Sequence, residues 1–122
     1  MLMIYLAGGM KSGWQDRVIS AVPKFSFKDP RAHGLRDEKA YTDWDLRAIR
    51  DSQIVLAYMD SQNPSGYGLA LEIGYAKALG REIWYVCEDI LDRQKFFGMV
   101  RACADRQFDS LDQAIDALAS YA

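Results

Sequence analysis

Residues 54–59 read Ile-Val-Leu-Ala-Tyr-Met, an apolar run in which hydrophobic and polar positions do not alternate. A strand with one face in water shows that alternation, so this run predicts a strand that is buried on both faces. Strands of this kind belong to parallel sheets that helices cover on either side. The stretch therefore predicts an α/β protein.

Strand-like and helix-like patterns alternate on both sides of this run. Further strands are expected at 3–7, 25–27, 82–87 and 106–108. Helices are expected at 14–22, from an N-cap at Thr42 to about Ser52, at 68–79 with Gly80 after its end, at 96–104, and from Ser110, which forms a capping box with Gln113. With right-handed crossovers, this order predicts a three-layer α/β/α sandwich around a five-stranded parallel sheet of flavodoxin-like order.

The composition limits the classes of molecule that the chain is expected to bind. The chain has 122 residues, of which 50% are hydrophobic and 26% charged, which suits a single domain over residues 1–122. The longest apolar runs, 1–7 and 54–59, are far shorter than the roughly 20 residues of a membrane-spanning helix, so no membrane partner is expected and the expected location is cytoplasmic. The net charge is −2 without a Lys/Arg cluster, so no nucleic-acid partner is expected. Cys87 and Cys103 are isolated and are expected to be free thiols. A small-molecule ligand fits this composition best.

Ligands of such sheets bind beyond the carboxyl ends of the strands, at the switch point of the strand order. The loops 8–13, 29–41 and 60–68 are expected at that edge. Candidate site residues in these loops and the adjoining elements are Tyr5, Gly8, Gly9, Lys11, Asp43, Asp45, Asp60, Ser65, Gly66, Gly68 and Glu72. The glycines would let the backbone approach a ligand closely, although tight turns after strands explain each of them equally well. The sequence has no His/Cys metal set and no Ser-His-Asp order, so neither a metal site nor a serine-hydrolase triad is expected.

Glu72 is unusual among these residues, because it lies about one turn into a helix with apolar flanks. Burying a carboxylate there costs desolvation energy, which the helix N-terminus offsets by less than about 2 kcal/mol. A partly desolvated, ionised carboxylate is a competent nucleophile, and an exposed helix glutamate is the alternative. Asp43 and Asp45 could equally complement a helix dipole, and Tyr5 could simply fill the core. His33, the only histidine, fits a loop residue better than a base.

Several motifs occur in a fixed order. Residues 5–9 read Tyr-Leu-Ala-Gly-Gly, Asp45-Leu46 precedes the segment 52–56, residues 63–68 read Asn-Pro-Ser-Gly-Tyr-Gly, residues 72–76 read Glu-Ile-Gly-Tyr-Ala, and residues 97–101 read Phe-Gly-Met-Val-Arg. In this order they resemble the nucleoside 2-deoxyribosyltransferase family and the related deoxynucleoside 5′-monophosphate N-glycosidases. The resemblance implies that Glu72 attacks the anomeric carbon, that Tyr5 orients this carboxylate and that Asp45 protonates the departing base. It also implies that the reaction needs no metal and no organic cofactor. A pair of carboxylates, one nucleophilic and one holding a proton, is also what retaining cleavage of a glycosidic bond requires.

The resemblance leaves the acceptor open. A second nucleobase that intercepts the glycosyl ester makes the protein a transferase. Water in its place makes it a (deoxy)nucleoside 5′-monophosphate N-glycosidase, a hydrolase. A third possibility, from another class, is a nucleotide-sensing module that keeps the pocket without turnover.

The 5′ end of the substrate and the oligomeric state are open as well. Ser65 lies where phosphate-accepting relatives have a Ser and typical transferases an Asp, and Lys11 could meet a phosphate or be a solvated loop lysine. Phe97 stands where relatives have an Asn or a Ser from a neighbouring subunit, and Met99 of the same segment is a further substrate-binding candidate. The implied partners are a nucleoside or nucleotide, a nucleobase and a second copy of the chain, in a homodimer or larger homo-oligomer.

Overall fold

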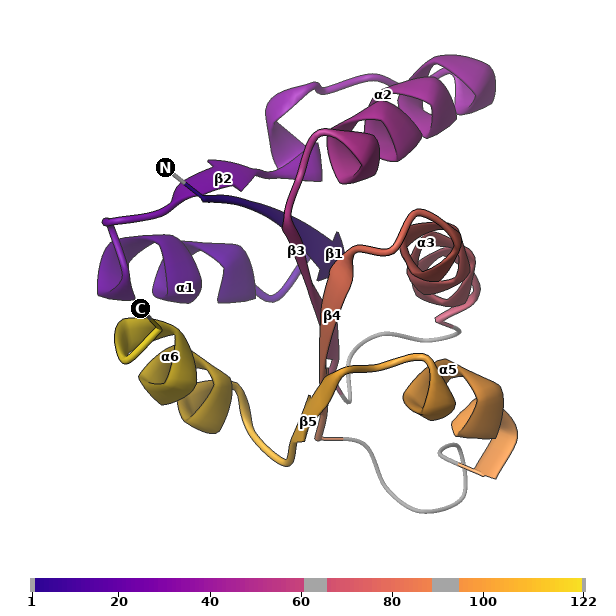
Figure 1. Ribbon diagram of the computed structural model, residues 1–122. Helices are drawn as coiled ribbons and strands as arrows, with labels where there is room; N and C mark the ends of the chain where they lie inside the picture. Colours follow the sequence, from indigo (N-terminus) through magenta and orange to yellow (C-terminus); the bar gives the residue numbers. More distant parts are fainter. Residues whose placement is uncertain (1, 61–65, 89–94, 122) are drawn as a thin grey trace.

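The computed structural model, which describes residues 2–60, 66–88 and 95–121, contains a five-stranded parallel sheet (Figure 1). Its strands are β1 (Met3–Gly8), β2 (Ser26–Lys28), β3 (Ile54–Met59), β4 (Glu82–Cys87) and β5 (Arg106–Phe108). They are ordered β2-β1-β3-β4-β5, and every pairing is parallel. The predicted fold class and the flavodoxin-like order are confirmed.

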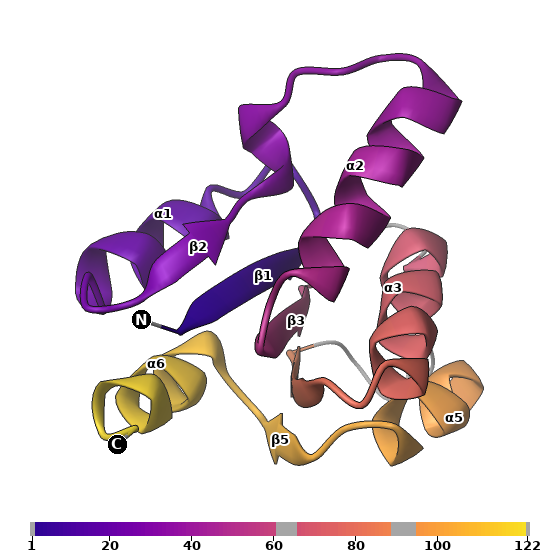
Figure 2. The ribbon, with the colours of Figure 1, turned by 45° about the horizontal axis from the view of Figure 1, so that its top comes forward.

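Helices cover both faces of the sheet (Figures 1 and 2). They are α1 (Trp14–Ala21), α2 (Glu38–Arg50), α3 (Tyr67–Ala78), α5 (Gly98–Ala102) and α6 (Leu111–Ala119), with short 3-10 turns at Pro30–Ala32 and Lys95–Phe97. Helices α1 and α6 lie on one face, and α2, α3 and α5 lie on the other. In the described part of the chain, no helix combines the length and the hydrophobicity that crossing a bilayer requires.

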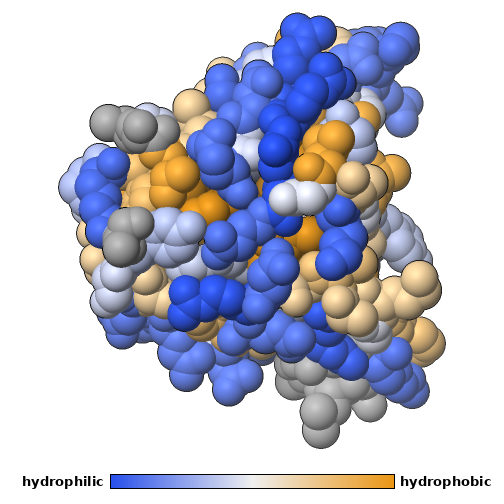
Figure 3. All heavy atoms as spheres, in the orientation of Figure 1, coloured by the Kyte–Doolittle hydropathy of each residue, from blue (hydrophilic) through white to orange (hydrophobic). Residues whose placement is uncertain are grey.

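The central strands divide their side chains between two hydrophobic clusters. On β1, Ile4 and Leu6 pack under α1 and α6, whereas Tyr5 and Ala7 face α2 and α3. All six residues of β3 are buried, as its unbroken apolar run predicted. On the outside, hydrophilic residues cover most of the face in Figure 3, and hydrophobic residues show in its central hollows and along its right-hand edge.

Helix α2 begins five residues earlier than the sequence predicts. Thr42 was the predicted N-cap, but the cap is Asp37, whose carboxylate accepts a hydrogen bond of 2.9 Å from the backbone N–H of Ala40. Asp37 has extended backbone and a carboxylate that reaches the N–H three residues ahead, so it caps the helix upstream of Thr42. Asp43 and Asp45 consequently lie beyond the first turn, and a capping role does not explain them.

Two glycines are required by the protein's own packing. Gly8 ends β1 with φ of 155°, and a Cβ there would lie 2.6 Å from the backbone oxygen of Tyr58 on β3. Gly66 precedes α3 in the left-handed region with φ of 73°, and a Cβ there would lie 2.6 Å from Met59 Cε and 3.0 Å from Phe97 Cζ. At these two positions, glycine is therefore required because other parts of the same chain come close to the backbone, whether or not a ligand binds.

We expect Gly66→Ala to lower the free energy of unfolding by about 2–3 kcal/mol, because left-handed backbone and crowding of the core both penalise the new methyl group. Gly74→Ala is the matched control, since Gly74 lies within α3 and a Cβ there meets nothing within 4 Å. That control should gain up to about 1 kcal/mol from helix propensity. Urea unfolding followed by circular dichroism measures the free energy of unfolding of both variants. Equal stability of the two variants would contradict the packing argument.

Candidate active site

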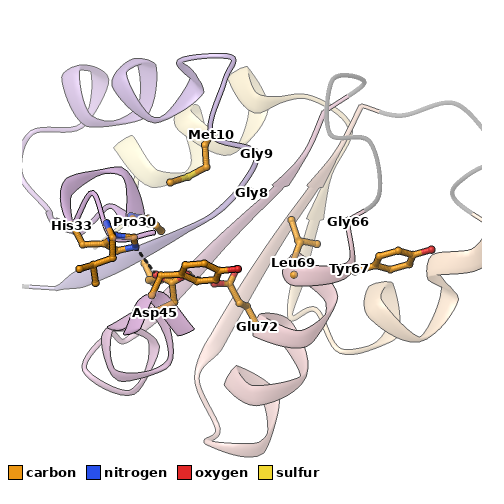
Figure 4. A pocket seen from close by; sticks show the side chains of 14 residues that line it. Gly8, Gly9, Met10, Pro30, His33, Asp45, Gly66, Tyr67, Leu69 and Glu72 are labelled. Atoms are coloured by element: carbon orange, nitrogen blue, oxygen red, sulfur yellow. Dashed lines mark hydrogen bonds and ion pairs between the residues drawn. The ribbon is translucent and has the colours of Figure 1, made fainter. Parts of the chain in front are cut away.

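A pocket of about 350 Å³ opens at the carboxyl ends of β1 and β3, the two neighbouring strands at the switch point of the sheet. Each of the three loops predicted to bind ligand contributes to it. The lining residues are Tyr5, Gly8, Gly9, Met10, Pro30, His33, Leu35, Tyr41, Asp45, Gly66, Tyr67, Gly68, Leu69 and Glu72 (Figure 4). The volume lies at the lower end of the roughly 300–1,000 Å³ usual for small-molecule sites.

Tyr5 and Glu72 are joined directly, although 67 positions separate them in sequence. The Tyr5 hydroxyl donates a hydrogen bond to Glu72 Oε2. Tyr5 is fully buried on the face of β1 that packs against α3, so its ring cannot turn away. Burial and the negative charge of Glu72 raise the pKa of Tyr5 far above its ordinary value. The phenol therefore stays protonated and remains a donor throughout the physiological pH range.

The Glu72 carboxyl group lies in the second turn of α3, and its pKa is shifted toward neutral pH. Burial raises the pKa of Glu72 to about 7; the hydrogen bond from Tyr5 lowers it, and the negative charge of Asp45 raises it further. The cost of desolvation therefore exceeds the stabilisation that the positive end of the helix gives to the ionised carboxylate. The sequence predicts the same balance, in which the helix offsets only part of that cost. A carboxyl group with a pKa near 7 is present in both protonation states under physiological conditions.

Asp45 faces the same pocket from the middle of α2, and Figure 4 shows it next to Glu72 with His33 beside it. Burial raises the pKa of Asp45, and the neighbouring His33 lowers it in part. The distance from His33 Nε2 to Asp45 Oδ1 is 3.3 Å. The sequence analysis treated His33 as an ordinary loop residue. The available signal was its position as the only histidine in a loop at the carboxyl edge of the sheet.

The structure brings together seven of the residues singled out from the sequence. Tyr5, Gly8, Gly9, Asp45, Gly66, Gly68 and Glu72 all line the pocket. The residues that it does not bring to this pocket are Lys11, Asp43, Asp60 and Met99. Ser65 lies outside the described residues. All of their roles remain predictions.

The structure shows what surrounds two of the candidates that do not line the pocket. Asp43 lies on the exposed side of α2 and pairs with Lys39 at 3.1 Å, one helical turn away. Asp60 is buried directly after β3.

The pocket also contains side chains that the sequence analysis did not select, namely Met10, Pro30, Leu35, Tyr41, Tyr67 and Leu69. These are mostly apolar and give the pocket a surface on which a flat, partly apolar ligand can pack.

Within the described ranges, no group of three or more His, Cys, Asp and Glu side chains lies close enough to hold a metal ion. The expectation of metal-free chemistry stays a prediction. The pocket does contain a protonated phenol and two carboxyl groups with raised pKa values. This set can hold a proton on one carboxyl group while the other is ionised, which suits a nucleophile paired with a general acid.

Known proteins resemble this chain in sequence and in fold. The model of one protein family, Nucleoside 2-deoxyribosyltransferase, matches residues 4–103. No curated protein matches the chain.

Several solved structures share the fold. A 2-deoxyribosyltransferase from Bacillus psychrosaccharolyticus is 17% identical, with a TM-score of 0.73 over 98% of this chain and 92% of that one. A 2-deoxyribosyltransferase from Leishmania mexicana is 18% identical, with a TM-score of 0.72 over 99% of both chains. A CMP N-glycosidase from Clostridium botulinum is 16% identical, with a TM-score of 0.67 over 98% of this chain and 99% of that one.

Proposed function

Because the chain belongs to the nucleoside 2-deoxyribosyltransferase family, we propose that it cleaves the N-glycosidic bond of a (deoxy)nucleoside through a glycosyl ester on Glu72 and passes the sugar to another nucleobase. At the coarser level, family and fold indicate a glycosyl transferase or N-glycosidase. The observation that carries the finer proposal is the hydrogen bond from Tyr5 to Glu72 in a pocket shared with Asp45. In this proposal residues 1–122 act as one catalytic domain.

The first half-reaction starts from the state of the pair in which Asp45 holds the proton and Glu72 is ionised. Because burial raises the pKa of Glu72 to about 7, the ionised form of Glu72 gains population as the pH rises through neutrality. The ionised carboxylate of Glu72 then attacks the anomeric carbon of the sugar. The bond from that carbon to the base nitrogen breaks, and its electron pair goes to the base. Asp45 donates a proton to the base, which leaves neutral, and Asp45 becomes a carboxylate. Tyr5 donates to Oε2 of Glu72, so it leaves Oε1 to form the ester.

In the second half-reaction, an acceptor attacks the same carbon from the face that the base has left. The ester bond to Glu72 breaks, and Asp45 takes the proton that the acceptor loses. Two displacements at one carbon return the original configuration. A nucleobase as acceptor gives transfer, and water gives hydrolysis.

The second candidate function is hydrolysis of a (deoxy)nucleoside 5′-monophosphate with the same residues. The observation in its favour is that one structural neighbour is a CMP N-glycosidase. We expect Ser65 and Lys11 to contact the group at the 5′ end of the substrate. A third candidate, a nucleotide-sensing module, would bind in the same pocket without turnover.

Incubation with deoxyinosine, with and without adenine, separates these functions. A transferase forms deoxyadenosine and releases hypoxanthine only when adenine is present. A hydrolase releases hypoxanthine without adenine, and the same assay on deoxyinosine monophosphate shows whether a 5′-phosphate is required. Saturable binding of these compounds with no released base would leave only the sensing module and would overturn the proposed chemistry.

We further propose that a second copy of the chain packs against the exposed hydrophobic side chains on α3 and the neighbouring 95–102 segment. These side chains are Tyr67 (80% exposed), Leu71 (60%), Phe96 (77%) and Met99 (86%). Clusters of exposed large hydrophobic residues mark interaction sites more often than free surface. Phe97, by contrast, is buried against Gly66 in its own chain, so the projecting side chains of this segment are Phe96 and Met99.

Sedimentation equilibrium should therefore give a mass of at least a dimer. Leu71→Glu should weaken the association, because it places a charge in the apolar contact. Lys77→Glu, also exposed on α3, is the control and should associate like the wild type. A monomeric wild type at micromolar concentration would contradict this part of the proposal.

A further inference from the structure

His33 lies beside the proposed acid, and the reaction scheme leaves it without a role. It follows the 3-10 turn Pro30–Ala32 in the connection from β2 to α2, and its side chain is only 9% exposed. The imidazole packs edge-on against Trp44, with the ring centroids 4.8 Å apart. This packing fixes the plane of the ring and leaves its two nitrogens to face different partners.

Those partners determine which nitrogen carries the proton. Nδ1 of His33 accepts a hydrogen bond of 2.9 Å from the backbone N–H of Leu35. A ring nitrogen that accepts a hydrogen bond holds no proton, so the neutral ring carries its proton on Nε2. Nε2 is the nitrogen that lies 3.3 Å from Asp45 Oδ1, as the dashed line in Figure 4 marks. The backbone of Leu35 therefore directs an N–H group toward the Asp45 carboxylate.

Asp45 Oδ1 has a matching need for a donor. The atom is buried, and among the described residues it makes no completed hydrogen bond. A buried acceptor without a donor is unfavourable, and His33 Nε2, 3.3 Å away, can satisfy it once the two groups align. Catalytic hydrogen bonds are often long in the free enzyme and tighten when substrate closes the site.

We propose that His33 is a positioning residue for Asp45, and that its Nε2–H tautomer, set by the backbone of Leu35, holds the carboxyl group in the orientation that serves the departing base. This inference rests on the proposed function, because it assigns His33 to the reaction of Asp45. The other titratable side chains around the pocket are Tyr5 on β1, Tyr41 on α2, and Tyr67 and Glu72 on α3. Among them, His33 places a ring nitrogen 3.3 Å from Asp45 Oδ1.

Substitutions at His33 test the role through the pH profile. His33→Ala should lower kcat by up to about 10²-fold, the scale for a displaced catalytic group, with KM changed less than about threefold. Because the N–H stabilises ionised Asp45, its loss raises the pKa of Asp45. Activity that requires protonated Asp45 then declines at a higher pH than in the wild type. His33→Gln, which offers an amide N–H near the position of Nε2, should recover most of kcat. Arg36→Ala, exposed in the same loop, is the control.

The tautomer can be measured without any assay of activity. His33 is the only histidine of the chain, so ¹⁵N NMR of histidine-labelled protein gives one pair of ring signals. We expect a protonated Nε2 and an unprotonated Nδ1, and we expect the Nε2 signal to move in Asp45→Asn but not in Arg36→Ala. A proton on Nδ1 overturns the inference, as does His33→Ala with wild-type kcat and pH profile.

The outcome for His33 is separable from the outcome for the function. Turnover in the wild type that disappears in Glu72→Gln upholds the proposed function whatever the His33 variants do. In that case a negative result at His33 overturns this inference alone. A wild type without turnover overturns both.

Discussion

Glu72→Gln is expected to lower kcat by about 10⁴-fold or more, because an amide cannot form the glycosyl ester and removal of a covalent nucleophile costs on that scale. The substitution keeps the shape of the side chain, and Tyr5 can still donate its hydrogen bond to an amide oxygen. Substrate affinity should therefore change much less than kcat. Single-turnover measurements with deoxyinosine separate the two quantities.

The same variant should be more stable than the wild type at alkaline pH. Burial raises the pKa of Glu72 in the folded protein to about 7 from its ordinary value of 4.5. Between these values the folded state binds more protons than the unfolded state, so the wild type loses stability as pH rises. The loss reaches up to about 3 kcal/mol above pH 7 and is absent below about pH 4.5. Glutamine carries no charge and avoids this loss.

Urea unfolding of wild type and Glu72→Gln at several pH values measures that difference. Their stabilities should coincide near pH 4 and diverge up to about pH 7. Near-wild-type turnover in Glu72→Gln would remove the nucleophile from the mechanism. A stability gap that does not depend on pH would show that the Glu72 carboxylate is not desolvated in the pocket.

Asp45→Asn is expected to lower kcat for deoxyinosine by about 10²–10⁴-fold, the usual contribution of a positioned general acid. An asparagine cannot give up a proton, so hypoxanthine would have to leave as an anion. The loss should be much smaller with 7-methyl-2′-deoxyguanosine, whose base already carries a positive charge and leaves as a neutral molecule. The ratio of the two rates is the diagnostic measurement.

Asp51→Asn serves as the matched control for this variant, because Asp51 is exposed at the carboxyl end of the same helix. It should leave both rates unchanged. Equal losses with the two substrates in Asp45→Asn would contradict an acid role and would indicate that Asp45 contributes to binding instead.

The fold could be predicted from the sequence because burial patterns along strands depend mainly on local composition. The apolar run 54–59 and the alternation around it gave the layers and the strand order. Helix boundaries depend on finer competition between neighbouring caps. Both Asp37 and Thr42 are good N-cap residues, and the one that comes first in the chain with extended backbone starts α2.

The candidate site was only partly accessible from the sequence. Glu72 stood out because a carboxylate among apolar neighbours on a helix costs desolvation energy. Asp45 had an ordinary explanation as a capping residue until the true start of α2 removed it. The contact of His33 with Asp45 depends on how the loop after β2 folds over α2, and no periodic pattern encodes such a contact. The reason for glycine at position 66 is equally tertiary, because Met59 and Phe97 occupy the space of a side chain.

The central claim is a covalent bond between a pentose and Glu72, and mass spectrometry of trapped enzyme tests it most directly. A 2-fluorinated nucleoside suits the experiment, because the electron-withdrawing fluorine slows breakdown of the ester. We expect a pentosyl adduct on the peptide covering residues 68–77, located at Glu72 by fragmentation and missing in Glu72→Gln. An adduct on another residue, or turnover that inverts the anomeric configuration without any adduct, would contradict it.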